Sequence, residues 1–265
     1  MATQIVQGKP NYGIDAPGLL RFFFIAGAVA FTIFLMVLFL STFGKISKII
    51  GGVIFGIASI YLLGMGCFML YSSKVMKLKD GEKLLDLVQW AGSERVLDVG
   101  CGRGLMLVGA AKRLTSGKAI GIDLWQQQDQ ANNSSDAALS NAEVEGVMER
   151  IEITTADMRQ LPFPNDSFDA VVSSWAVHNL EVESDREKAL DEMIRVLKPN
   201  GIVVLSDIIY QLEYAKYFEL RGMINIRLHN NAIRDLILKA VTFGSFAPSA
   251  VLAFKMNGGT VSHNM

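Results

Sequence analysis

The 265-residue chain has few of the residues that hold small or metal-bound proteins together. Its two cysteines, Cys67 and Cys101, are too few for a disulfide framework, and its three histidines are too scattered for a zinc motif. Lysine and arginine (25) almost balance aspartate and glutamate (26), which argues against nucleic-acid binding driven by bulk charge. Only 19% of the residues are charged and 51% are hydrophobic, so a mainly disordered chain is excluded.

Two long uncharged runs near the N-terminus carry the hydrophobic excess. Phe22–Phe43 has no charged side chain, and neither has Ile49–Ser73. As helices, both would reach about 30 Å or more, which is the thickness of a bilayer's hydrocarbon core. Neither shows the polar stripe of a buried soluble helix, and the first is longer than the apolar part of a signal peptide. We therefore predict an N-terminal membrane anchor over residues 1–80, with transmembrane helices at about 22–43 and 49–71.

Basic residues beside the two runs predict the orientation of this hairpin. The short linker between the runs carries two lysines, whereas the outer flanks carry five basic residues, namely Lys9, Arg21, Lys74, Lys77 and Lys79. Because basic loops stay on the cytoplasmic side, both termini and all residues after 80 should face the cytoplasm. The protein is thus predicted to be an integral membrane protein with two spans, and the lipid bilayer is its first predicted partner. The oligomeric state does not follow from the sequence.

After residue 80, short apolar runs alternate with amphipathic segments. The predicted strands are Arg95–Val99, Ala119–Leu124, Ile151–Thr155, Phe168–Ser173 and Gly201–Ser206. The predicted helices are Gly81–Trp90, Gly104–Leu114, Ser135–Glu145 and Ser184–Leu197, and the last is followed by a turn at Lys198–Gly201. This alternation predicts an α/β domain over residues 81–265 with a doubly wound, mostly parallel sheet. Ligands of such sheets bind beyond the carboxyl ends of the strands.

The segment after the first strand has the composition of a ligand-binding loop. Gly100, Gly102 and Gly104 alternate with other residues, which permits a sharp turn and brings bare main chain to a ligand. A dinucleotide site would need a further glycine where Leu105 stands. Asp98 would also repel a pyrophosphate, and it suits a cationic group such as an α-ammonium.

Acidic residues also follow the second and third strands. Asp123 lies where a carboxylate can accept hydrogen bonds from ribose hydroxyls, and Leu124 could lie flat against an adenine. Asp157 could accept a hydrogen bond from an exocyclic amine, while the Met158 amide donates to a ring nitrogen. Trp125 could cover the adenine or pack on the sheet, and the sequence leaves both readings open.

Four segments, VLDVGCGRG, GIDL, TADMRQLPFPNDSFDAVVSS and VLKPNGIVVLSD, together resemble the class I S-adenosylmethionine-dependent methyltransferases, in the small-molecule branch called type 11. The resemblance covers about residues 82–208. It implies a seven-stranded Rossmann-like sheet, methyltransferase activity and S-adenosyl-L-methionine as cofactor. It also implies the following cofactor-binding residues: Asp98 near the ammonium, Gly100, Cys101, Gly102 and Gly104 on the methionine moiety, Asp123 and Leu124 on the adenosine, Asp157 and Met158 on the adenine, and Ser173 through its main chain.

His178 is the candidate catalytic residue. It follows the fourth strand, where a neutral imidazole could take a proton from an acceptor, and the alternative is a structural histidine. Cys101 lacks an evident basic partner, so a packing role is favoured over a nucleophilic one. Asp207, after the fifth strand, could orient a substrate or cap the next helix, and the cap is slightly favoured.

The segment 211–256 contains two further amphipathic stretches and a final strand, Ala250–Phe254. One stretch has an apolar face made of Ile233, Leu236, Ile237, Val241 and Phe243. Such a face packs on a sheet edge, forms a lid, or dips into a bilayer.

These observations predict a membrane-anchored methyltransferase that acts at the cytoplasmic face. Its acceptor would be small and lipophilic, such as a quinone or phenol, a sterol or other lipid, or a thiol. No metal and no nucleic acid are expected. Two alternatives remain, which are a nucleotide-dependent oxidoreductase, disfavoured by Leu105 and Asp98, and a non-catalytic cofactor-binding membrane scaffold.

Overall fold

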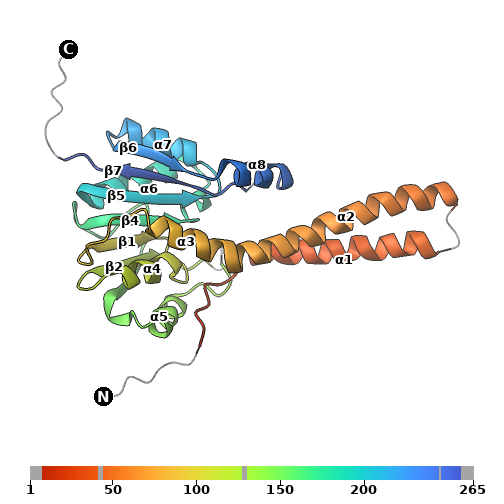
Figure 1. The fold of residues 1–265 in the computed structure, drawn as a ribbon, viewed down its shortest axis with the longest axis horizontal. Coiled ribbons are helices and arrows are strands. Elements are labelled where there is room, and N and C mark those ends of the chain that lie inside the picture. The colour runs from red at the N-terminus through yellow and green to blue at the C-terminus, as the bar shows by residue number, and fades with distance from the viewer. Residues whose placement is uncertain (1–7, 41–43, 127–129, 245, 258–265) are drawn as a thin grey trace, which may run out of the picture. The chain divides into compact units, whose positions relative to one another are not determined.

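The computed structural model describes residues 8–40, 44–126, 130–244 and 246–257 (Figure 1). Its contacts divide the chain into two compact units. One unit comprises Gly13–Leu78 with Gln126–Asn132, and the other comprises Met1–Tyr12, Lys79–Trp125 and Asn133–Met265. The first unit contains the two predicted apolar helices, and the second contains the predicted α/β domain.

The smaller unit is a hairpin of two long helices, α1 (Pro17–Phe39) and α2 (Lys45–Tyr71). α1 begins at Pro17, five residues before the predicted start of the span at residue 22. The last predicted residues of the span, 41–43, lie outside the described residues. A Cβ atom on Gly27 would lie 2.7 Å from the Leu63 side chain, so glycine allows the close approach of the helices there. The Ser59 hydroxyl donates a hydrogen bond to the Gly27 carbonyl at 3.3 Å.

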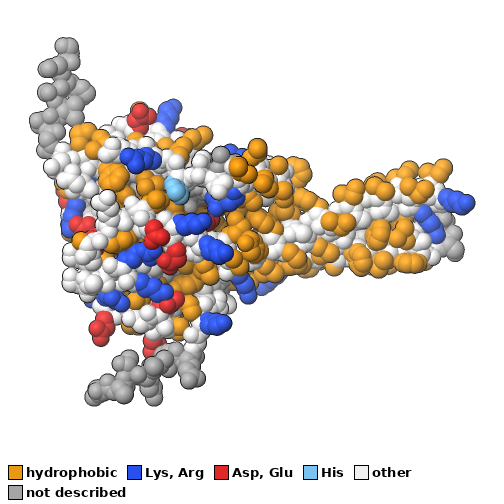
Figure 2. Space-filling model, in the orientation of Figure 1, with side chains coloured by type: hydrophobic (Ala, Val, Ile, Leu, Met, Phe, Trp, Pro, Cys, Tyr) orange, Lys and Arg blue, Asp and Glu red, His pale blue; other side chains and the backbone are white. Residues whose placement is uncertain are grey.

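Both helices are long and apolar enough to cross a membrane. Their outward side chains are large, hydrophobic and exposed, including Phe22, Ile25, Ile57 and Ile60 (Figure 2). A core helix of a soluble protein would be mostly buried, whereas few residues of these two helices are. Length, composition and exposure therefore agree with the predicted spans.

The larger unit is built on a seven-stranded sheet of order β3-β2-β1-β4-β5-β7-β6. The strands are β1 (Arg95–Val99), β2 (Lys118–Asp123), β3 (Ile151–Thr155), β4 (Phe168–Ser174), β5 (Leu197–Asp207), β6 (Ile224–His229) and β7 (Ser249–Phe254). β1 to β5 pair in parallel, and β7 is antiparallel to both β5 and β6. The predicted doubly wound, mostly parallel Rossmann-like sheet of seven strands is confirmed.

Two hydrophobic clusters cover the two faces of this sheet. Adjacent β1 residues alternate between them, with Val96 in one cluster and Leu97 in the other. The helices are α3 (Lys77–Leu85), α4 (Leu105–Arg113), α5 (Ser135–Val144), α6 (Glu183–Val196), α7 (Gln211–Leu220) and α8 (Ala232–Val241). Single helical turns lie at η1 (Ser72–Met76), η2 (Met148–Arg150) and η3 (Val177–Asn179). Because helices cover both faces, the β1–β5 strands need apolar side chains on both sides.

Three local expectations differ from the structure. The helix predicted over 81–90 begins earlier and ends at Leu85. The turn predicted at 198–201 lies inside β5 as an irregularity, since Phe168 pairs with Leu197 but Ala170 pairs with Ile202. The sequence did not reveal β6, because it is an edge strand whose side chains are largely exposed and show no buried run.

We predict that Leu107→Ala lowers the unfolding free energy by about 2–5 kcal/mol, because it leaves a cavity under the fully buried start of α4. The matched control is Leu220→Ala, at an exposed leucine of α7, which should change it by less than about 0.5 kcal/mol. Denaturant unfolding of the full chain in detergent measures both. Equal effects of the two substitutions would show that the α4 face is not part of the core.

Candidate active site

The loop between β1 and α4 brings bare main chain to the carboxyl edge of the sheet. Gly100, Gly102 and Gly104 have φ angles of 73°, 52° and 84°, in the region that favours glycine. The N–H groups of Gly100 and Cys101 both donate to the Ile122 carbonyl at 2.9 Å, which ties the loop to β2. The predicted glycine turn therefore lies at the predicted edge.

A side chain at Gly100 would collide with the loop that follows β4. Its Cβ atom would lie 2.3 Å from the Ala176 Cβ, which is closer than side chains ever approach. The Met158 side chain is also beside this position, at 3.7 Å. Three loops, those after β1, β3 and β4, therefore meet at Gly100.

Asp98 is a buried carboxylate without a partner. Its exposed fraction is 1%, and neither oxygen makes a hydrogen bond to any described residue. Burial is the main cause that raises the pKa of Asp98 to about 8. The Leu107 amide lowers this pKa somewhat, although its position relative to Asp98 does not meet the geometry of a normal hydrogen bond. The nearby Asp123 carboxylate raises the pKa further.

Asp123, at the end of β2, already holds the loops around it. One carboxylate oxygen accepts from the Gly102 N–H at 2.8 Å, and the other accepts from the Trp125 N–H at 2.6 Å and from Asn133 at 3.2 Å. Leu124 is half exposed. The Trp125 indole donates to Thr155 at 2.8 Å and packs against the core, so the packing reading of Trp125 fits the structure better.

Asp157, after β3, is paired with a neighbouring arginine. Both of its oxygens accept from the Arg159 guanidinium at 2.6–3.0 Å, and these hydrogen bonds hold the pKa of Asp157 below its usual value. Arg159 in turn reaches Asp185 at 2.7 Å. The sequence pattern did not predict this pairing, although Arg159 stands only two residues from Asp157.

Ser173 and Cys101 turn their side chains away from any ligand. The fully buried Ser173 hydroxyl donates to the Val99 carbonyl at 2.8 Å and so joins β4 to β1. The Cys101 sulfur packs so tightly against β2 that a Cβ on Gly121 would lie 2.8 Å from it. Burial raises the pKa of the Cys101 thiol, which keeps it protonated. Both side chains are therefore occupied within the protein.

His178 and Asp207 form a pair across the ends of β4 and β5. The His178 Nδ1 is hydrogen bonded to one Asp207 oxygen, and the His178 N–H donates to the other at 2.9 Å. The Ile208 N–H (2.9 Å) and the Tyr214 hydroxyl (3.2 Å) also donate to this fully buried carboxylate. Burial, and then contact with the Asp207 carboxylate, raise the pKa of Tyr214, so its hydroxyl keeps its proton.

This pairing corrects the reading of Asp207 as a helix cap. α7 begins after Tyr210 without a side-chain cap, and Asp207 binds His178 instead. Because the carboxylate can only accept, Nδ1 is the donor in this pair, and Nε2 is the ring nitrogen left to face other groups. The His178 side chain is 18% exposed, so it remains accessible. Nothing in the sequence indicated this contact beyond the presence of an acid after the fifth strand.

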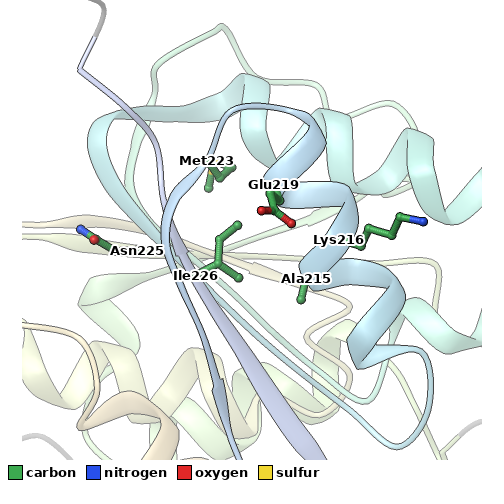
Figure 3. Close-up of a pocket in the computed structure, with 6 residues that line it drawn as sticks. All are labelled: Ala215, Lys216, Glu219, Met223, Asn225 and Ile226. Carbon is green, nitrogen blue, oxygen red and sulfur yellow. The ribbon is translucent and has the colours of Figure 1, made fainter.

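A separate hollow of about 460 Å³ lies between α7 and β6, lined by Ala215, Lys216, Glu219, Met223, Asn225 and Ile226 (Figure 3). Ile224, which lies between the lining residues Met223 and Asn225, is level with Ile202 of β5, and Ile202 pairs with Ala170 near the start of β4. The hollow therefore lies toward the amino end of β4, whereas His178 follows its carboxyl end. Within the described part of the chain, no cluster of three or more His, Cys, Asp or Glu side chains could hold a metal ion.

Comparison with known proteins supports the same family. Residues 97–205 match the family model described as "Methyltransferase domain". A relative from Geotalea daltonii, named a ubiquinone/menaquinone biosynthesis C-methyltransferase, is 34% identical over 121 residues, which are 45% of this chain and 48% of the relative. The chain thus matches about half the length of this curated relative.

Two solved structures share the fold. A geranyl diphosphate C-methyltransferase from Streptomyces coelicolor has a TM-score of 0.54 at 16% identity, covering 71% of this chain and 82% of that chain. The [4+2]-cyclase SpnF also has a TM-score of 0.54, at 19% identity, covering 68% and 81%. The fold alone therefore does not fix the reaction. Residues 97–205, which contain the glycine loop, therefore match the methyltransferase domain family.

Proposed function

We propose that this protein is a membrane-anchored methyltransferase that uses S-adenosyl-L-methionine and methylates a small, lipophilic acceptor at the cytoplasmic face. The single observation that carries the activity is the meeting of the glycine loop with the loop of His178 at Gly100 and Ala176. At this contact, bare main chain that could receive a ligand would lie beside the loop of the proposed base. The family match over 97–205 supports the choice of cofactor.

The residues at this edge fit the cofactor. Asp98 is a buried carboxylate that lacks a partner, and a cationic α-ammonium would supply one. The main chain at Gly100, Cys101, Gly102 and Gly104 would carry the methionine moiety, because only glycine leaves that surface open. The Ser173 main chain would meet the same moiety from β4. Each of these assignments remains a proposal.

The adenosine would lie along the ends of β2 and β3. Asp123 would accept from the ribose hydroxyls, with the exposed Leu124 against the adenine and Asp157 and Met158 at its edge. A carboxylate has about four acceptor positions, and Asp123 uses three of them, so it can accept a further donor. Asp157 already accepts four hydrogen bonds from Arg159, so an adenine amine would have to replace one of them. Their present bonds would hold them in place before a ligand arrives.

When bound, the sulfonium supplies a methyl group that is already activated for transfer. The protein must then orient the acceptor and receive its proton. His178 Nε2 would accept that proton, and the resulting imidazolium would be stabilised by Asp207 through Nδ1. Tyr214 and the Ile208 amide hold the carboxylate still during this step. The arrangement favours an acceptor that loses a proton, such as a phenol, a hydroquinone carbon or a thiol.

The hairpin would anchor this domain in a bilayer. Its exposed apolar side chains need a lipid environment, and the basic residues at its outer flanks would place the domain on the cytoplasmic side. A membrane location would also bring the enzyme to acceptors that are dissolved in lipid. The comparison proteins named for ubiquinone/menaquinone and geranyl diphosphate chemistry are consistent with an acceptor of this kind.

The activity can be tested by incubating the full chain in detergent or lipid with methyl-labelled cofactor and a membrane extract. We expect label in an extractable small molecule. His178→Gln and Asp207→Asn should each lower the turnover by about 10²–10⁴-fold, because the base or its orientation is lost. Cofactor affinity should not change in either variant.

The matched control for these variants is Glu219→Gln, an exposed carboxylate on α7, which should keep full turnover. Unchanged turnover in His178→Gln would remove His178 from catalysis. Tight cofactor binding without label in any acceptor would favour a scaffold, and binding of a nicotinamide nucleotide instead would favour an oxidoreductase.

Asp98 gives a second, independent prediction. Its carboxyl has a pKa of about 8 when folded, against 3.8 in the unfolded chain. Between these values the unfolded chain releases a proton that the folded protein keeps, so the stability of the ligand-free protein falls as pH rises. Asp98→Asn removes this penalty. Its stability relative to the natural protein should therefore rise from pH 5 to 8, by up to about 1.4 kcal/mol per pH unit.

Denaturant unfolding of the ligand-free full chain at several pH values measures this difference. Glu219→Gln should show no such trend, since that carboxylate is exposed. If Asp98→Asn were less stable than the natural protein by the same amount at every pH, Asp98 would have an internal partner and no need of a cationic ligand.

A further inference from the structure

α8 exposes a continuous apolar face. Ile233, Leu236, Ile237, Val241 and the following Phe243 are 46–85% exposed. Their spacing puts them along one side of the helix, while Leu238 and Thr242 are buried on the other side. Figure 2 shows hydrophobic side chains gathered over α8. A contiguous patch of this kind on a folded domain marks a surface that contacts another apolar phase.

This face lies at the carboxyl edge of the sheet. α8 joins β6 to β7, and His229 at the end of β6 is level with Ala250 of β7, which pairs with Ser206 of β5. Ser206 directly precedes Asp207, the partner of His178. α8 therefore stands at the same edge as the proposed base.

The loop after α8 contacts the loop that carries His178. The Phe246 ring meets the Trp175 ring edge-on, with centroids 5.5 Å apart. The Ala247 N–H donates to the Ile208 carbonyl at 3.3 Å, beside Asp207. A ligand that approaches along α8 would thus reach the proposed acceptor site directly.

The charges around α8 select a lipid surface as its occupant. Arg234 of α8 forms an ion pair with Asp80 of α3 at 2.9 Å. In the chain, only η1 and the first residues of α3 separate Asp80 from the end of α2. The exposed lysines of α3 and α8 are Lys79, Lys83 and Lys239, of which Lys239 lies on α8 itself. An apolar helix face accompanied by exposed lysines is the pattern of helices that lie in an anionic membrane interface.

We propose that α8 is a membrane-interface helix, which inserts its apolar face among anionic lipid headgroups and lets acceptor molecules pass from the bilayer to the site at His178. The proposal rests on the membrane anchoring in the proposed function and adds a second, separate contact with the bilayer. It also assigns a role to the apolar face at residues 233–243, for which the sequence left three readings open.

Fluorescence quenching in lipid nanodiscs tests this contact. The full chain with Cys67→Ala would carry one environment-sensitive label at Leu236→Cys, in nanodiscs containing phosphatidylglycerol and spin-labelled lipid. Cys101 is buried, and the chain without an added cysteine measures any labelling of it. The matched control is Leu220→Cys on α7, because the two leucines are 71% and 73% exposed. Ile60→Cys in α2 reports on the hairpin separately.

We expect the label at position 236 to be quenched about twofold or more by the spin-labelled lipid, and the label at 220 to be unaffected. A label at 236 that behaves as in water would overturn the proposal. Emission from the label at 236 that indicates an apolar environment, without quenching by the spin-labelled lipid, would also overturn it. In that case, protein and not lipid would cover the apolar face of α8. If the label at position 60 is not quenched while the label at position 236 is, the result contradicts the proposed hairpin anchor and supports the proposed interface helix.

A second variant links the contact to activity. Leu236→Glu with Ile237→Glu should lower transfer to a bilayer-dissolved acceptor about tenfold or more, and leave cofactor affinity unchanged, because a charged face leaves the headgroup region. Leu220→Glu should have no effect. Equal transfer by both variants would show that α8 does not serve acceptor entry.

Discussion

The contact between Gly100 and Ala176 is the constraint on which the candidate site depends. No side chain fits between the loop after β1 and the loop after β4, because a Cβ on Gly100 would lie 2.3 Å from the Ala176 Cβ. Two functions are joined at this point. The first loop offers open main chain for a ligand, and the second carries His178, two residues beyond Ala176. Position 100 needs glycine for two reasons: the backbone there has a positive φ, and a side chain would collide with Ala176.

Asp207 organises the other half of the site. It accepts hydrogen bonds from His178 by two atoms, from Ile208 and from Tyr214, and it is fully buried. A buried carboxylate is stable only when donors surround it, and here the donors meet that need. Asp98 shows the opposite condition, since it is equally buried but neither of its oxygens receives a hydrogen bond. The protein therefore satisfies the hydrogen-bonding capacity of Asp207 and leaves that of Asp98 unmet.

The sequence predicted the parts of the fold that local patterns determine. The strand bounds of β1 and β3 were correct, because buried parallel strands are short apolar runs between turn residues. The glycine loop was placed correctly, because alternating glycines after a strand have few other uses. β6 was missed, since an exposed edge strand lacks that apolar run. The site's side-chain pairs were also missed, because His178 and Asp207 meet only when β4 and β5 pair.

The edge formed by Asp98, the glycine loop and Asp123 is the proposed binding site of S-adenosyl-L-methionine. Titration calorimetry of the full chain in detergent, with the natural protein and Asp123→Ala compared, tests this binding. We expect one-to-one binding of the sulfonium compound, no binding of a nicotinamide dinucleotide, and an affinity about tenfold or more weaker in the variant, because the ribose hydroxyls lose their acceptor. No heat with the sulfonium compound, or undiminished affinity in Asp123→Ala, would contradict it.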